Sequence, residues 1–309
     1  MGKLTSDRFT EKNKDICVFF SFDMVGSTKF KAKEETWPFY ISQFYYTVYT
    51  ELQREIQQIK VWKYLGDEIL LYVSIQDLGL DLDSRSSFLI KIPEKVYKVQ
   101  SEAAKKIQED LFMPELEVKS TVWIAGVQTI WSYENKKLDK NYQNIIATID
   151  MEAKGETENK TENGAKDRDD FLGPDMDIGF RVAKFAFHHK VVLSADFAYL
   201  LHEIPTKIKD EEIDYKIDYK IDDDLQIVSY EILKGVWNEQ YYPIVWYFPD
   251  WKSKDLLFFY DDHKKNPIVD RVLSGRIDPI DKLTQVYKEL GKTKEIDAFV
   301  NECISCLKQ

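Results

Sequence analysis

The hydrophobic positions of this chain fall into short apolar runs that alternate with longer amphipathic stretches. The run at residues 16–22 is rich in branched and aromatic side chains and predicts a buried strand. Two further runs, at residues 59–65 and 69–73, flank a Gly-Asp dipeptide and predict a β-hairpin. Residues 37–58, with Pro38 in the first turn, and residues 96–112 have the spacing of helices.

The second half of the chain continues this alternation. It predicts strands at residues 118–130, 191–193, 226–233 and 243–248, a helix at residues 176–187 and another ending at Leu201. An alternating repeat at residues 213–221 predicts an edge hairpin rather than a repeat architecture. Strands interleaved with helices, and hairpins among the strands, predict an α/β (α+β) fold around a sheet of mixed direction.

Composition changes divide the chain further. The polar stretch at residues 76–94 predicts an inserted loop. Residues 135–169 predict a mobile insertion, because residues 152–169 have no aromatic side chain and are dominated by Glu, Lys, Asn, Asp and Gly. We therefore expect one domain over residues 1–250 and a helical extension over residues 251–309, with Pro279 near a helix start.

The overall charge narrows the classes of partner. With 43 basic and 54 acidic residues the net charge is −11, which argues against a nucleic-acid backbone or an anionic membrane as the main partner. The chain has no run of 18 apolar residues and no apolar segment near Met1, so we expect a cytoplasmic protein. Its cysteines, Cys17, Cys303 and Cys306, form no disulfide framework, and the last two fit one face of a final helix.

Two carboxylates stand where apolar strands end. Asp23 opens a turn through Gly26, Ser27 and Thr28 toward a helix, and Asp67 lies in the Gly-Asp turn. Paired carboxylates suit two Mg²⁺ or Mn²⁺ ions, which polarise both sides of a phosphoryl transfer. The backbone N–H groups of the turn at residues 24–28 could hold phosphate. Taken singly, Asp23 could equally be an N-cap and Asp67 an ordinary turn residue.

Three segments in the same order resemble the motifs of class III adenylyl and guanylyl cyclases. Residues 20–28 (Phe-Ser-Phe-Asp-Met-Val-Gly-Ser-Thr) resemble the first metal motif, and residues 63–67 (Lys-Tyr-Leu-Gly-Asp) resemble the second. Residues 170–181, which run from Asp170 through Gly173 to Arg181, resemble the third. The resemblance implies the class III cyclase fold, with a mostly antiparallel sheet, flanking helices and a homodimer whose two active sites each combine residues of both chains.

The resemblance also implies a role for individual residues. Asp23 and Asp67 would bind the two divalent cations, while Lys63 and Asp170 would read the base. Arg181 would stabilise charge on the reacting phosphate, and Lys234, before Gly235, weakly resembles a triphosphate-binding lysine and could equally be an exposed turn residue.

Asp177 departs from the family, which has Asn at this position. An ionised carboxylate cannot donate a hydrogen bond as an amide does, so Asp177 is protonated, binds something else or has lost the role. A salt bridge to a neighbouring Lys or Arg is the alternative.

Lys63 as donor and Asp170 as acceptor satisfy adenine, cytosine and uracil alike, so hydrogen bonding alone leaves the base open. Residues 175–181 and 242–247 resemble the pyrimidine cyclases of the Pycsar anti-phage systems. That resemblance implies conversion of UTP to cyclic UMP, or of CTP to cyclic CMP, and activation of a separate effector protein. An adenylate cyclase, an inactive nucleotide sensor and an interaction scaffold remain alternatives, and intact Asp23, Asp67 and Arg181 argue against the sensor.

Overall fold

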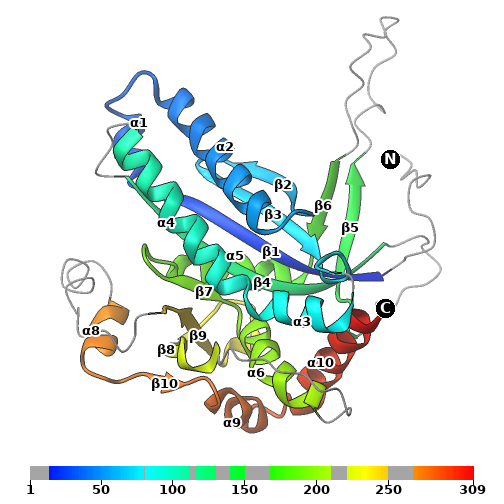
Figure 1. Ribbon diagram of the computed structural model, residues 1–309. Helices are drawn as coiled ribbons and strands as arrows, with labels where there is room; N and C mark the ends of the chain where they lie inside the picture. Colours follow the sequence, from blue (N-terminus) through cyan, green and yellow to red (C-terminus); the bar gives the residue numbers. More distant parts are fainter. Residues whose placement is uncertain are drawn as a thin grey trace, which may run out of the picture.

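The computed structural model describes residues 14–79, 81–110, 116–129, 140–149, 168–209, 221–249 and 267–309. Its strands are β1 (Lys14–Val25), β2 (Lys60–Leu65), β3 (Glu68–Ser74), β4 (Glu117–Thr129), β5 (Asn144–Ile149), β6 (Arg168–Leu172), β7 (Val191–Leu193), β8 (Leu225–Ile232), β9 (Tyr241–Tyr247) and β10 (Asp278–Pro279). They form one sheet in the order β10-β8-β9-β7-β4-β1-β3-β2, and β5 pairs with both β4 and β6 (Figure 1). The pairs β4–β5 and β4–β7 are parallel and the other described pairs are antiparallel.

The α-helices are α1 (Ser27–Lys31), α2 (Trp37–Glu55), α3 (Leu82–Ile90), α4 (Ile92–Asp110), α5 (Pro174–Val182), α6 (Ala195–Lys209), α8 (Pro267–Leu273), α9 (Lys282–Glu289) and α10 (Thr293–Lys308). Single 3₁₀ turns are η1 (Ile75–Asp77), η3 (Ala183–Phe185), η4 (Ile221–Asp223) and η5 (Trp237–Glu239). The predicted α+β class, with a mixed and mostly antiparallel sheet flanked by helices, is confirmed. No helix among these is long and apolar enough to cross a membrane.

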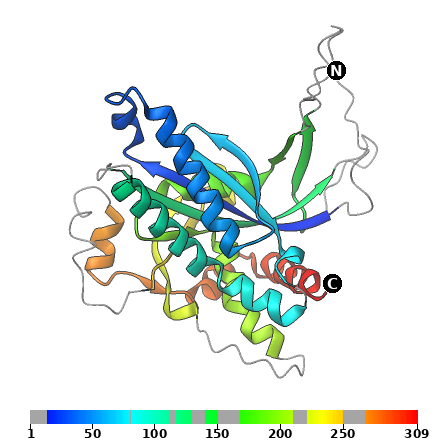
Figure 2. The ribbon, with the colours of Figure 1, turned by 45° about the horizontal axis from the view of Figure 1, so that its top comes forward.

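The central strand β1 divides the core into two faces. Its even-numbered side chains from Ile16 to Met24, among them Phe20 and Phe22, belong to the main core cluster. Helices α2 and α4 contribute to the same cluster and lie side by side across the sheet (Figures 1 and 2). Helix α2 buries Ile41, Phe44, Val48 and Leu52 on one face, as the three-to-four-residue spacing predicts. On the opposite face, Phe19 belongs to a second, aromatic cluster with Trp62, Trp123 and Phe171, among others.

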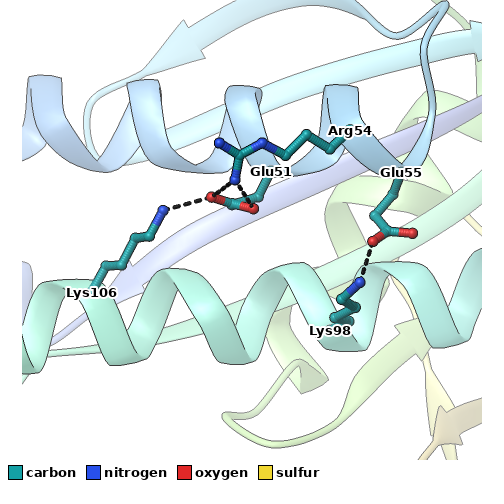
Figure 3. A network of polar contacts seen from close by, with 5 residues as sticks. All are labelled: Glu51, Arg54, Glu55, Lys98 and Lys106. Atoms are coloured by element: carbon teal, nitrogen blue, oxygen red, sulfur yellow. Dashed lines mark hydrogen bonds and ion pairs between the residues drawn. The ribbon is translucent and has the colours of Figure 1, made fainter.

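Ion pairs fasten α2 to α4 at their solvent side. Glu51 of α2 forms ion pairs with Lys106 of α4 and with Arg54, at N···O distances of 2.6 and 2.8 Å. Glu55 of α2 forms an ion pair with Lys98 of α4 at 2.5 Å (Figure 3). The hydrogen bond from Lys106 lowers the pKa of Glu51 more than burial raises it, so this carboxylate is ionised at neutral pH. Partly exposed pairs of this kind contribute roughly 0.2–1 kcal/mol each, so packing carries most of the contact.

One local prediction was wrong, and another was confirmed. Residues 76–94, expected as a loop, contain α3 and the first turn of α4, because Asp81 and Ser84 form a capping box and Ser86, Leu89 and Ile90 are buried. Pro279 lies near a helix start, as predicted. It lies in β10, which pairs with β8, and α9 begins at Lys282.

Other predictions lie partly outside the described residues. Within the interval 135–169, residues 144–149 form β5 and residues 168–169 begin β6, while residues 150–167 are not described. Most of the repeat at residues 213–221 also lies outside the described residues. The helix expected at residues 176–187 ends at Val182 and continues as the 3₁₀ turn η3. The proposed boundary near residue 250 remains a prediction, and Val300, Cys303 and Leu307 of α10 join the main core cluster.

Gly179 sets how closely α5 approaches the sheet. A Cβ on this residue would lie 2.4 Å from two ring atoms of Trp123 on β4, closer than packed atoms allow. Glycine is therefore needed here for close approach, whereas alanine is usually the better helix former.

We predict that Gly179→Ala destabilises the protein by about 1–3 kcal/mol, because the added methyl group overpacks the contact with Trp123. An ordinary helix glycine would instead gain up to about 1 kcal/mol on this substitution. Urea denaturation measures the change. The double variant with Trp123→Phe should lose less than the sum of the two single variants, since the smaller ring leaves room. A stabilised Gly179→Ala protein would contradict the close-approach interpretation.

Candidate active site

The end of β1 and the β2–β3 turn bring Asp23 and Asp67 to one place. The backbone N–H of Met24 donates to the carbonyl of Asp67 at 3.3 Å, which joins the strand end to the turn. Asp23 pairs in register with Glu68 of β3 and with Lys119 of β4. Directly paired residues point to the same face of a sheet, so Glu68, Asp23 and Lys119 form one row across three strands.

Each of the two aspartates has a lysine beside it. Lys119 Nζ lies 2.8 Å from Asp23 Oδ2, and Lys31 Nζ lies 3.1 Å from Asp67 Oδ1. The buried hydroxyl of Ser27 donates to Asp67 Oδ2. Gly26, with φ of 87°, makes the left-handed turn that places Ser27 there, whereas Thr28 is exposed.

The electrostatic environment of Asp23, Glu68 and Asp67 favours binding of a cation. Burial raises the pKa of Asp23, Lys119 opposes this shift, and the negative charge of Asp67 adds to it. Burial likewise raises the pKa of Glu68, against the hydrogen bond from Ser21 and with a further contribution from Asp23. The charge of Asp67 therefore disfavours ionisation of both Asp23 and Glu68, and a bound cation would relieve this repulsion.

A cavity of about 150 Å³ opens over Asp23 and Glu68. It is lined from the sheet by Ser21, Asp23, Glu68, Lys119 and Thr121, and from the α5–η3 segment and beyond by Phe180, Ala183, Lys184 and Ala186. The Phe180 ring also lies 5.9 Å from the Trp62 ring, so one aromatic side chain borders both the acidic cavity and the aromatic cluster.

Lys63 and Asp170 meet although 107 residues separate them in sequence. Lys63 Nζ lies 2.8 Å from Asp170 Oδ1, and each side chain is about 30% exposed. Trp62 Nε1 and the backbone N–H of Phe171 donate to the same oxygen, at 2.8 and 3.0 Å. Burial raises the pKa of Asp170. The hydrogen bonds from Lys63 and Trp62 and the positive charge of Lys63 together lower it by more, so the pKa of Asp170 lies below its usual value.

Arg181 approaches the turn that contains Lys234. A guanidinium nitrogen of Arg181 lies 3.8 Å from the position of a Cβ on Gly235, and no described residue accepts a hydrogen bond from its buried Nε. Lys234 itself is exposed. Asp177, one turn before Arg181 on α5, is also exposed, and the salt bridge considered for it is not formed with any described residue.

The donor chemistry of the acidic group fits hard cations, since Mg²⁺ and Mn²⁺ prefer carboxylate oxygens. Asp23 and Asp67 are the residues that would hold them, with Glu68 adjacent. Within the described part of the chain, however, no group of three or more His, Cys, Asp or Glu side chains has a metal-binding arrangement. Phosphate oxygens or water would have to complete the coordination.

A larger cavity, of about 200 Å³, lies between α5, α6 and the C-terminal helices. Asp175 and Asp196 line it, together with Trp237, Tyr287 and Lys292. Burial raises the pKa of Asp175 to about 7, and the charge of Asp196 adds to the shift. None of the predicted residues lines this larger cavity, although Gly235 beside Lys234 does, whereas Asp23 lines the smaller one.

Comparison with known proteins gave structural neighbours only. No protein-family model and no curated protein sequence matches the chain. It is similar to the adenylyl cyclase CyaB from P. aeruginosa, at 10% identity and a TM-score of 0.42 over 76% of this chain and 94% of that one. It is also similar to the guanylyl cyclase Cya2, at 10% identity and a TM-score of 0.43 over 76% and 91% of the two chains.

A further neighbour is the guanylate cyclase domain of RhGC from Catenaria anguillulae in complex with GTP. It is 9% identical, with a TM-score of 0.40 over 76% of this chain and 97% of that one. Similarities at this level establish neither the family nor the activity of this chain.

Sequence reasoning missed four residues of the site: Lys31, Trp62, Glu68 and Lys119. Glu68 adjoins Asp67, and Trp62 adjoins Lys63, so both could have been found by asking what flanks each motif. Lys119 carried no local signal, because only the register of β1 with β4 places it against Asp23.

Proposed function

We propose that this protein is a class III nucleotidyl cyclase, which closes a nucleoside triphosphate into a 3′,5′-cyclic monophosphate and releases pyrophosphate. The observation that carries the proposal is the ion pair between Lys63 and Asp170, because motifs far apart in sequence supply a donor and an acceptor that meet. The adjacent carboxylates of Asp23 and Asp67 and the approach of Arg181 to the Lys234–Gly235 turn support it.

In the proposed reaction the ribose 3′-oxygen forms a bond to the α-phosphorus while the bond to the bridging oxygen of the β-phosphate breaks. Two divalent cations held by Asp23 and Asp67 would favour loss of the 3′-hydroxyl proton and polarise the α-phosphate. Lys31 and Lys119 pair with these carboxylates and would have to release them for cations to bind there. Arg181 and Lys234 would stabilise the charge that develops on the phosphates.

The active site is proposed to form between two chains. Among the described residues of one chain, no hydrogen bond or ion pair joins Asp23 or Asp67 to Lys63 or Asp170. A symmetric dimer with two composite sites would let each chain supply cation-binding residues to one site and base-reading residues to the other.

UTP is the proposed substrate, with CTP as the alternative. Uracil has an N3–H donor beside the O4 acceptor, which complements the carboxylate of Asp170 and the ammonium of Lys63. The resemblance to pyrimidine cyclases supports a pocket for one ring rather than two. The resemblance to Pycsar cyclases supports a role for cyclic UMP as a messenger in anti-phage defence, acting on a separate effector protein.

Asp67→Ala should abolish cyclisation, because it removes a cation-binding carboxylate. The fold should persist with a loss of about 1 kcal/mol, since the side chain lies in a turn and is partly exposed. Turnover of each triphosphate with Mn²⁺ measures the effect. Asp77→Ala is the matched control, because it also removes a lysine-paired carboxylate but lies outside the site. An active Asp67→Ala protein would rule out the two-metal proposal, and an inactive wild type would favour the sensor.

A mixture of Asp23→Ala and Lys63→Ala chains should recover about a quarter of wild-type activity, although each variant alone is inactive. Half of the randomly formed dimers are mixed, and each mixed dimer keeps one intact site of two. A mixture of Asp23→Ala with Asp67→Ala is the control and should stay inactive, because both variants damage the cation-binding half. Equal behaviour of the two mixtures would show that the sites are not shared between chains.

With all four triphosphates at equal concentration and matched Mn²⁺, we expect cyclic UMP to form fastest, as identified by mass spectrometry. Guanine offers its O6 acceptor beside two donors, N1–H and N2–H, so the pair of Lys63 and Asp170 leaves its second donor without a partner, and both purines need a larger pocket than a pyrimidine. Asp170→Ala should lower kcat/KM for UTP about 10- to 100-fold, because the uracil N3–H is left unpaired. Faster production of cyclic AMP than cyclic UMP would overturn the base assignment and leave the cyclase proposal standing.

A further inference from the structure

The two carboxylate oxygens of Asp170 differ in their hydrogen bonds to described residues. Its Oδ1 accepts from Trp62 Nε1, Lys63 Nζ and the backbone N–H of Phe171. A carboxylate oxygen has about two lone-pair sites, so three donors use it fully. Among the described residues none donates to Oδ2, which remains the free acceptor.

A bulge in β2 places Trp62 and Lys63 on the same face of the sheet. Val61 pairs with Leu71 of β3 and Lys63 pairs with Leu70, so Trp62 is an extra residue between two consecutive partners. Adjacent residues of a regular strand point to opposite faces, whereas a bulge can re-aim a side chain. Here the indole N–H and the ammonium group therefore reach the same carboxylate oxygen.

The aromatic cluster fixes the plane of the indole. The Trp62 side chain is 93% buried, with its ring centroid 5.6 Å from Phe19 and 5.3 Å from Phe171, both in edge-on contact. Lys63 Nζ lies 4.2 Å from the ring centroid, so Trp62 contacts both members of the ion pair. Such packing restricts the direction in which the indole N–H can point.

We propose that Trp62 is a positioning residue for base recognition: its indole N–H holds Asp170 so that Oδ2, beside the Lys63 ammonium, faces a base with a donor next to an acceptor. The N3–H and O4 of uracil form such a pair. The inference rests on the proposed function for its substrate, whereas the contact between Trp62 and Asp170 does not depend on it.

Trp62→Phe keeps an aromatic ring and removes only the N–H donor and part of the ring. Asp170 should then be less firmly oriented, so KM for UTP and the calorimetric Kd for UTP should rise about 10-fold while kcat changes little. Loss of the donor also raises the pKa of Asp170, and binding requires the ionised form. The acid limb of kcat/KM should therefore move to higher pH.

Trp123→Phe is the matched control. Trp123 belongs to the same aromatic cluster and is buried, but its indole N–H has no hydrogen-bond partner among the described residues. This variant should lose stability through packing while the KM and the acid limb stay at wild-type values. The inference fails if both variants lose the same stability and Trp62→Phe changes neither KM nor the acid limb of kcat/KM. Trp62 would then contribute only to packing.

A measurement without nucleotide separates this inference from the proposed function. In ¹⁵N-labelled full-length protein, the Trp62 indole N–H signal should shift with the protonation of Asp170, and Asp170→Asn should abolish that titration. The Trp123 signal should not follow it. A Trp62 signal that is insensitive to Asp170 overturns the inference. If the signal titrates but no triphosphate is bound or cyclised, the proposed function fails and the role in base recognition fails with it.

Discussion

The pairing register of β1 is the constraint on which the rest of the structure depends. Its twelve residues run antiparallel to β4 on one side and, over seven residues, to β3 on the other. Slippage by one residue would exchange the two faces and put Phe20 and Asp23 on the wrong sides. The same register that buries the core under α2 and α4 thus delivers Asp23, Glu68 and Lys119 to one row at the strand end.

Pairing with lysines explains how the carboxylates at this strand end can lie close together. Asp23 and Asp67 each have a lysine within hydrogen-bonding distance, and those lysines come from β4 and α1. The protein therefore offsets the charge of partly buried carboxylates with lysine side chains from neighbouring elements. Fixed burial of an unpaired carboxylate would cost far more.

Much of the fold could be predicted because its elements are strongly patterned: the apolar run before Asp23, the Gly66–Asp67 hairpin turn and the spacing of the buried face of α2. Part of what failed depended on tertiary context. Strand β5 is short and lies in a polar region, and its pairing with β4 and β6 decides its conformation. In the site, motif residues were found by resemblance, whereas partners such as Lys119 became visible only through strand register.

The bulge at Trp62 shows how such a site could change over generations. One extra residue in β2 brings a new side chain onto the face of Lys63, yet Val61 and Lys63 still oppose consecutive residues of β3. The four-residue interval from Lys63 to Asp67 is untouched by it. A single-codon insertion could therefore supply a second donor to Asp170, and a single-codon deletion could remove it, without shifting the hairpin tip or the frame of the sheet.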